Sequence, residues 1–276
     1  MRAQALGAGM LAQSQSAIAP FRLHRPTTLT QATVLVAEYP EATIAAGCSD
    51  LVARIREGER IERLISLQRV AELREIDESD GMLRIGAAVS HHDGSMHPIV
   101  RTAIPGFAAA WSSIATVRIR YTGTIGGNVM AARTRYEMPL LLGALGAEYD
   151  YDATGRLLCN ARVDTTGLRW FGYERSMRPT ATLALAVRAA PAGGLDIRAV
   201  AGSEYRPGYT LTAHAPGDDL RDLAPSALAA TLADQLPDEC ADHTGSADYR
   251  RHLVKVLTGR ILRAAVDDGV ERTPTP

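Results

Sequence analysis

Two glycine-bearing loops constrain this chain more than any other feature. Gly47-Cys48-Ser49-Asp50 lies between a predicted buried strand and a predicted helix, and Gly123-Thr-Ile-Gly-Gly-Asn128 precedes an apolar segment. Glycine permits positive φ and a close approach of the backbone, so several amide N–H groups can converge on one anion. The two loops lie far apart in the chain, and we predict that they close around the same anionic group.

Polar and basic side chains accompany both loops. The hydroxyls of Ser49 and Thr124 and the amide of Asn128 could add hydrogen bonds to a ligand. The second loop is flanked by Arg118, Arg120, Arg133 and Arg135. A diphosphate-containing ligand would explain amides, hydroxyls and arginines together. The alternative, two ordinary turns with solvated arginines, stays open. Neither loop matches GxGxxG or the Walker A pattern, which disfavours a standard Rossmann or P-loop fold.

Composition excludes several classes of protein. The chain has 276 residues, of which 46% are hydrophobic and 22% charged, as in ordinary globular proteins. Thirty basic and thirty-one acidic side chains give a net charge of −1, which argues against a nucleic-acid or membrane surface. The three cysteines, Cys48, Cys159 and Cys240, have no CxxC spacing. They argue against a disulfide scaffold, a zinc site or an iron–sulfur cluster held by this chain.

The chain divides into a tail and three predicted parts. Residues 1–20 are rich in Ala, Gln and Ser and predict a flexible N-terminal tail. They lack the features of a signal peptide, so we expect a cytoplasmic protein. A β-α-β-α-β unit is predicted over 21–76, a second unit over 77–170, and a small α+β C-terminal domain over 171–276.

Local patterns place the elements of these parts. Thr28 followed by Gln31 fits a capping box, and Pro40 ends the helix that it begins. The other expected helices cover 51–56, 99–115, 137–145, 224–236 and 248–266. Strands are expected over 42–46, 63–67 and 82–87, and hairpins over 148–159 and 181–200.

Six segments, in this order and spacing, resemble one known family. The strongest match is Arg120-Tyr-Thr-Gly-Thr-Ile-Gly-Gly-Asn128, followed by Ala46-Gly-Cys-Ser-Asp-Leu51. The other segments are Phe21–Pro26, Leu83–Ala87, Met138–Ala147 and Gly245–Arg250. They resemble the FAD-binding (medium) subunit of the molybdenum hydroxylases, which are relatives of carbon monoxide dehydrogenase, xanthine dehydrogenase and the N-heterocycle hydroxylases.

The resemblance implies a fold, a cofactor and partners. The implied fold class is α+β: a two-subdomain FAD-binding fold of the vanillyl-alcohol-oxidase-like type plus a small α+β C-terminal domain. FAD would lie between the subdomains with its diphosphate on the two loops. The partners would be an iron–sulfur subunit and a molybdopterin subunit in a heterotrimeric complex that can dimerise. Electrons would pass from molybdenum through iron–sulfur clusters to FAD, and then to NAD, a quinone or oxygen.

The resemblance also implies which residues contact FAD. No residue is assigned as a catalytic acid, base or nucleophile, because the redox chemistry belongs to the flavin. The expected cofactor contacts are Ala46, Gly47, Cys48, Ser49, Asp50, Leu51, Gly123, Thr124, Ile125, Gly126, Gly127, Asn128 and Glu137.

Three departures from the family pattern concern the flavin site. Cys48 replaces the second glycine of the first loop, and its side chain would disfavour positive φ there. Glu137 stands where the family commonly has Asp, and its carboxylate reaches one methylene further. The chain between Cys159 and Phe171 is shortened by roughly one strand and its turn.

Other interpretations of the chain stay open. An FAD-free scaffold within an assembly and a stand-alone flavoenzyme acting on a small molecule would both fit the departures. His91-His92, with His97 nearby, suggests a metal site, but adjacent histidines point apart on a helix or strand, and a polar cofactor contact is the alternative. Cys48 could be a nucleophile at a helix N-terminus or a packed thiol, and the absence of an assignable histidine partner favours the packed thiol.

Overall fold

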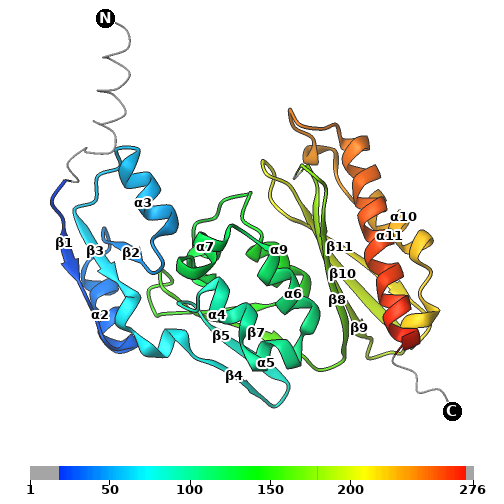
Figure 1. Ribbon diagram of the computed structural model, residues 1–276, viewed down its shortest axis with the longest axis horizontal. Helices are drawn as coiled ribbons and strands as arrows, with labels where there is room; N and C mark the ends of the chain where they lie inside the picture. The colour runs from blue at the N-terminus through cyan, green and yellow to red at the C-terminus, as the bar shows by residue number, and fades with distance from the viewer. Residues whose placement is uncertain (1–18, 179, 272–276) are drawn as a thin grey trace, which may run out of the picture.

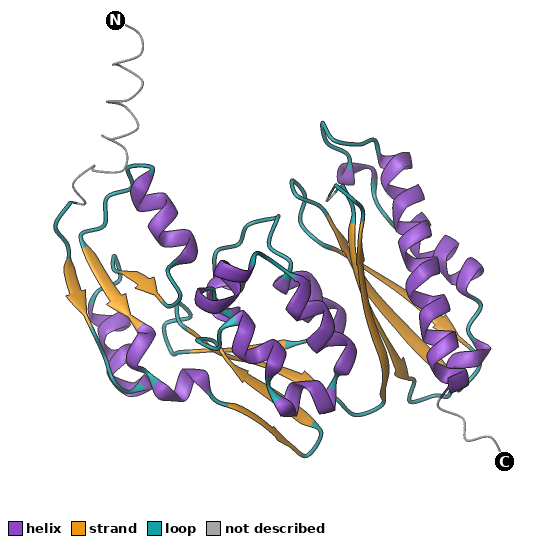
Figure 2. Cartoon of the chain, in the orientation of Figure 1, coloured by secondary structure: helices purple, strands orange, loops and turns teal. Residues whose placement is uncertain are grey.

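Three sheets follow one another along the chain and make up the fold (Figures 1 and 2). The computed structural model describes residues 19–178 and 180–271, so the predicted tail lies outside it except for its last two residues. None of the helices in these ranges is long and apolar enough to cross a membrane.

The first sheet is small and parallel, with strand order β1-β3-β2. Its elements are β1 (Arg22–His24), α2 (Leu29–Glu38), β2 (Thr43–Ala45), α3 (Ser49–Arg56) and β3 (Arg63–Ser66). The predicted cap is half confirmed, because Thr28 Oγ1 accepts from Gln31 N–H at 3.2 Å while Gln31 Oε1 accepts from Thr27 N–H instead. Two 3₁₀ turns, Leu67–Arg69 and Ala71–Arg74, lead to the next sheet.

The second sheet is antiparallel, with order β4-β5-β7-β6. Its strands are β4 (Ile76–Ser79), β5 (Met82–Gly86), β6 (Glu148–Tyr151) and β7 (Leu158–Asp164). The helices of this unit are α4 (His91–Met96), α5 (Pro98–Ala103), α6 (Pro105–Ser113), α7 (Val117–Thr122), α8 (Ile125–Met130) and α9 (Met138–Leu145), of which α5, α8 and α9 contact the sheet. The long helix expected over 99–115 is two helices, because Pro105 begins a new one at its N1 position.

The third sheet is antiparallel, with order β11-β10-β9-β8. It consists of β8 (Leu168–Arg175), β9 (Thr182–Ala189), β10 (Leu195–Gly202) and β11 (Tyr209–Ala215). Helices α10 (Pro225–Asp234) and α11 (Ala247–Glu271) cover one face, and α6 and α9 of the second unit lie against the other (Figure 2). Two 3₁₀ turns, Leu220–Asp222 and Asp238–Cys240, precede the two helices. A sheet covered on both faces explains why β9 reads as an almost continuous apolar run.

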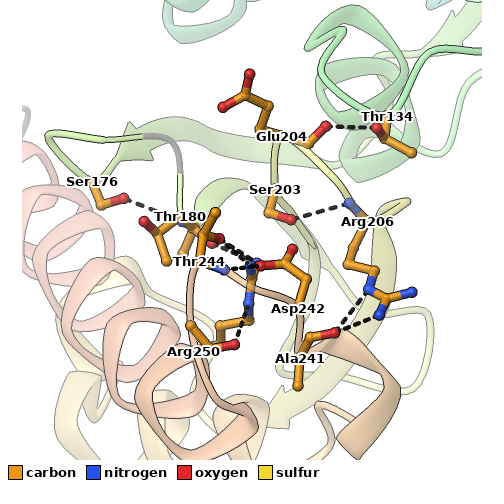
Figure 3. A network of polar contacts seen from close by, with 12 residues as sticks. Thr134, Ser176, Thr180, Ser203, Glu204, Arg206, Ala241, Asp242, Thr244 and Arg250 are labelled. Atoms are coloured by element: carbon orange, nitrogen blue, oxygen red, sulfur yellow. Dashed lines mark hydrogen bonds and ion pairs between the residues drawn. The ribbon is translucent and has the colours of Figure 1, made fainter.

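A buried arginine holds the loops at one end of the third sheet (Figure 3). Arg250 of α11 donates to Thr180 O at 2.6 Å and to Thr244 Oγ1 at 2.8 Å, and it pairs with Asp242 at 2.6 Å. In the same region Thr134 Oγ1 donates to Glu204 O at 2.6 Å. This last bond ties the segment between α8 and α9 to the third sheet.

The element boundaries fall close to the predicted domain boundaries. The second sheet begins at Ile76 and the third at Leu168, against predicted starts of 77 and 171. The division into 21–76, 77–170 and 171–276 stays a prediction, since a sheet is not by itself an independent domain. The region between Cys159 and Phe171, which the sequence comparison with the family described as shortened, contains most of β7 and the start of β8. Strand β7 pairs with both β5 and β6.

Candidate functional site

Residues 46–51, called loop 1 below, connect β2 to α3. Cys48 caps α3 in the left-handed region, with φ 58° and ψ 6°. The five N–H groups of residues 47–51 donate to no acceptor among the described residues. A left-handed residue before a helix N-terminus turns successive N–H groups outward, and such a turn binds anions.

The backbone conformations of the two glycine-bearing loops differ from two expectations, one about Cys48 and one about the glycines. Cys48 adopts positive φ although it is not glycine, so its side chain has not forced the loop into another conformation. Gly47, Gly123, Gly126 and Gly127 are absent from the described residues with positive φ. Their freedom to adopt positive φ is therefore not why the loops contain glycine.

Residues 123–128, called loop 2 below, form the junction between α7 and α8. Five of its six N–H groups donate within the protein, and only that of Thr124 lacks an acceptor in the described chain. Asn128 Oδ1 accepts from Met138 N–H at 3.2 Å and so holds the start of α9. The expectation that loop 2 offers a set of converging amides is wrong, because its amides hold the loop itself in place.

Close packing explains the glycines in these loops. A Cβ atom on Gly47 would lie 1.8 Å from Thr122 O, so glycine is what lets loop 1 contact the end of α7. A Cβ atom on Gly126 would lie 2.7 Å from both the Cβ and the O atom of Ala87. Gly127 is exposed, and a Cβ atom there would meet only Thr124 Oγ1, at 3.0 Å.

A cleft of about 680 Å³ lies between the first two units, and both loops line it. Its volume is within the range of small-molecule and cofactor sites. Eleven of the predicted cofactor contacts line it: Ala46, Gly47, Cys48, Ser49, Asp50, Leu51, Gly123, Thr124, Gly127, Asn128 and Glu137. Ile125 and Gly126 do not, because both are buried and their N–H groups donate to Val89 O and Ala87 O.

A carboxylate on loop 1 is clamped by residues that follow loop 2. Asp50 Oδ1 accepts from Arg133 Nε at 2.8 Å and from the Tyr136 hydroxyl at 2.9 Å, and Arg54 Nε lies 3.3 Å from Asp50 Oδ2. Burial opposes ionisation of Asp50, but the hydrogen bonds from Arg133 and Tyr136 outweigh it and lower the pKa of this carboxyl. The cluster links the two loops and neutralises the acidic group nearest to the free amides.

A second carboxylate lies where the third sheet reaches the cleft. Glu137 precedes α9, and its Oε1 accepts from the hydroxyl of Tyr173 and from Arg175 Nη1, the latter at 3.3 Å. Burial, and then the charge of Glu137, raises the pKa of Tyr173, which therefore stays a protonated donor. Glu137 and Arg175 both line the cleft and can present charge of either sign to a ligand.

Basic side chains are distributed unevenly around the cleft. Arg133 and Arg135, of the four arginines that flank loop 2, line it, and Arg118 and Arg120 do not. Arg120 instead donates to Ile114 O and Ala115 O at 3.2 and 3.0 Å. Sequence reasoning missed Arg54 and Arg175, which also line the cleft. Arg54 lies on α3 one turn after Asp50, so helical spacing could have indicated it, whereas Arg175 comes from β8 and is brought there only by the folded chain.

The histidines and the loop 1 thiol have structural partners. No group of three or more His, Cys, Asp or Glu residues in the described chain could hold a metal ion. His92 stacks on Tyr121 with ring centroids 4.1 Å apart, whereas His91 is buried. Cys48 Sγ lies 3.5 Å from Ala46 O, and burial raises the pKa of the thiol, which disfavours a nucleophilic thiolate.

The residues that line the cleft fall largely within a segment that is similar to a known protein family. Residues 19–159 match the model of a family described as the FAD binding domain in molybdopterin dehydrogenase. The chain is 35% identical over 113 residues to the xanthine dehydrogenase FAD-binding subunit of Escherichia coli O157:H7, an alignment that covers 40% of this chain and 39% of that subunit. The alignments to the first relatives thus span about two fifths of their length.

Two further similarities cover most of the chain. The carbon monoxide dehydrogenase medium chain of Afipia carboxidovorans is 27% identical over 278 residues, which is 89% of this chain and 96% of that one. Quinoline 2-oxidoreductase from Pseudomonas putida 86 superposes with a TM-score of 0.75 at 23% identity, covering 91% of this chain and 99% of that one. The latter similarity establishes the mixed helix and sheet fold.

Proposed function

Because the chain belongs to the family of FAD-binding domains in molybdopterin dehydrogenases, we propose that it is the FAD-binding, electron-transfer subunit of a molybdenum-containing hydroxylase or dehydrogenase. FAD is the cofactor that the family and the named FAD-binding relatives support. When bound, FAD supplies both two-electron and one-electron transfer. The chain would pass electrons from iron–sulfur clusters to this cofactor and on to NAD, a quinone or oxygen.

One observation carries the proposal: the five unpaired N–H groups of loop 1 line a cleft of about 680 Å³. Unpaired backbone N–H groups at a helix N-terminus favour an anion such as a diphosphate, both by hydrogen bonding and through the helix dipole. Arg133 and Arg135 line the same cleft and add positive charge. The residues present therefore fit FAD.

Residues of loop 1, loop 2 and the start of α9 would contact different parts of the cofactor. Loop 1 would bind the diphosphate through its amides, and Ser49 would add its hydroxyl. Loop 2 would contribute the Thr124 N–H and the open face of Gly127, where the absence of a side chain leaves room. Glu137 would hydrogen-bond the cofactor where the third sheet closes the cleft. Ile125 and Gly126 would act only by supporting loop 2.

The proposed partners are an iron–sulfur subunit and a molybdopterin subunit. Relatives named as medium chains and as FAD-binding subunits support a place in a multi-subunit complex. We assign the first two units to the vanillyl-alcohol-oxidase-like type of FAD-binding fold, and residues 171–276 to the family's C-terminal domain. A cytoplasmic location stays a prediction from the sequence, which fractionation of the native host tests.

Ser49 offers a test that separates binding from folding. It is exposed and occupies the first position of α3. Ser49→Asp places a carboxylate at a helix N-terminus, which favours the helix but repels a diphosphate. We expect wild-type protein to show flavin absorbance bands and release FAD on denaturation, and the variant to fold normally but retain at least tenfold less FAD. Ser49→Asn is the neutral control and should bind FAD almost as wild type does.

Two outcomes would redirect the proposal. A colourless wild-type protein that binds no added FAD would favour the FAD-free scaffold. A yellow protein that never co-purifies with iron–sulfur and molybdopterin subunits from its native host would favour a stand-alone flavoenzyme. Equal FAD content in wild type and Ser49→Asp would move the diphosphate away from loop 1.

A further inference from the structure

His91 is a buried polar side chain in the wall of the cleft. It begins α4, is 1% exposed, and lines the cleft next to Gly123. A Cβ atom on Gly123 would lie 3.1 Å from His91 Cδ2, so the ring edge next to Nε2 faces loop 2. The absence of a side chain at Gly123 leaves that edge of the imidazole open.

Trp111 fixes the tautomer of His91. Trp111 Nε1 lies 2.9 Å from His91 Nδ1, and both groups are buried. An indole N–H can only donate, so Nδ1 must be the acceptor and the ring proton must sit on Nε2. Burial also lowers the pKa of His91 to about 4, so the imidazole is neutral at physiological pH.

The Nε2–H group has no acceptor in the described part of the chain, and Nε2 is not among the fully buried unpaired atoms, so this edge of the otherwise buried ring reaches the cleft. A donor that faces a cleft and has no protein acceptor is left to bind water or a ligand. A group that is locked in orientation, neutral and open to a cleft is arranged to donate to a ligand. Its neutrality suits an uncharged acceptor, because the charged phosphate oxygens already have the loop 1 amides and arginines.

We propose that His91 is a specificity-determining residue, held as its Nε2–H tautomer by Trp111, which donates a hydrogen bond to an uncharged acceptor atom of the bound dinucleotide. The acceptor is a ring nitrogen, a carbonyl oxygen or a sugar hydroxyl. This inference rests on the proposed FAD binding, but it assigns a contact outside both loops. Trp111 acts through His91 and is therefore a positioning residue.

Equilibrium binding of FAD to purified variants, followed by quenching of flavin fluorescence, tests the contact. His91→Phe keeps a ring but removes the donor, and we expect it to raise the Kd for FAD about tenfold. His91→Gln can accept from Trp111 and donate to the ligand, and it should remain within about threefold of wild type. The matched control is the neighbouring His92→Phe, which does not line the cleft and should bind FAD as wild type does.

Nitrogen-15 NMR of the FAD-free protein provides a readout that does not depend on binding. We expect the His91 signals of a neutral ring protonated at Nε2, and a shift of the Nε2 signal when FAD is added. In Trp111→Phe the ring should sample both tautomers. A proton on Nδ1 in wild type would overturn the proposal.

The failures of this inference and of the proposed function are distinguishable. Failure of wild-type protein to bind FAD defeats the proposed function before any histidine is compared. Tight binding by wild type with an unchanged Kd in a folded His91→Phe defeats only the role of His91. Thermal melting identifies the folded variants. If His91→Phe does not fold, the nitrogen-15 NMR of wild-type protein keeps the test decisive, because an Nε2 signal that does not move when FAD binds would overturn the proposal.

Discussion

Loop 1 and loop 2 line the same cleft but use their backbones in opposite ways. The N–H groups of residues 47–51 in loop 1 have no acceptor in the part of the chain that the structure describes, whereas five of the six N–H groups in loop 2 donate within the protein. Loop 1 contains the left-handed residue, Cys48, and loop 2 contains none. Loop 1 therefore has the properties of an anion site, and loop 2 those of a wall that keeps the cleft open.

This difference shows that glycines in similar loops are required for different physical reasons. Gly126 is needed because Ala87 leaves no space for a Cβ atom, and Gly127 because it faces the cleft. Two adjacent glycines thus serve packing and ligand access separately. Substituting each glycine separately therefore tests whether packing and ligand access are distinct roles.

The largest expected effect is that of Gly126→Asp. Its Cβ atom would clash with Ala87 and bury a carboxylate in the core of the second unit. Overpacking costs about 1–3 kcal/mol, and an unpaired buried charge several more. We expect the free energy of unfolding, measured by urea denaturation, to fall by more than about 4 kcal/mol.

Gly127→Asp is the matched substitution one residue away. Its side chain would enter the cleft beside Thr124 and only a small adjustment would be needed. We expect stability within about 1 kcal/mol of wild type, but FAD affinity reduced at least tenfold at low salt and less so at high salt. Equal loss of stability in both variants would contradict the separation of packing from ligand access.

A smaller effect is expected at the ion pair that joins the loops. Asp50→Asn removes the charge that Arg133 and Arg54 share, and partly exposed pairs of this kind contribute about 1 kcal/mol. The folded-state pKa of Asp50 is lowered, so its contribution is present above the ordinary pKa and is lost as pH falls through the lowered value.

Urea denaturation across pH measures this contribution. Wild type should exceed Asp50→Asn in stability by a constant amount above about pH 5, and the difference should shrink below about pH 4. The nearby Glu57→Gln, whose carboxylate forms none of the ion pairs described for the chain, is the control. A difference that persists at low pH would mean that Asp50 acts through packing and not through its charge.

Much of the fold could be predicted from local patterns. The helix Leu29–Glu38 has a capping residue and a proline at its two ends, and Arg63–Ser66 and Met82–Gly86 are short apolar runs between turns. The expected helix at 137–145 and the hairpin of β9 and β10 are also confirmed. Strand β11 was not predicted, although the alternation of apolar and polar residues over 209–215 is the pattern of a strand with one buried face, against which α10 packs.

The site was harder to predict than the fold. Loop positions could be recognised from residue order, but the use of each N–H group depends on neighbours distant in the chain, such as Ala87 and Val89 for loop 2. Arg175 reaches the cleft only because the third sheet packs on α9. The isolated pair His91-His92 gave no indication that one ring is locked by Trp111 and the other stacked on Tyr121.

The smallest expected effect concerns the left-handed residue that distinguishes loop 1. Cys48 holds φ 58°, a region that costs a residue with a side chain about 1–2 kcal/mol relative to glycine. Cys48→Gly relieves this strain but gives the unfolded chain more freedom, so we expect a net gain of about 0.5–1 kcal/mol in stability. Cys48→Ala removes the thiol and keeps the strain, so it should gain nothing. If Cys48→Ala stabilised the protein as much as Cys48→Gly, the strain would lie in the thiol and not in the backbone. The unpaired N–H groups of loop 1 would then be explained by the start of α3 alone, without the left-handed residue.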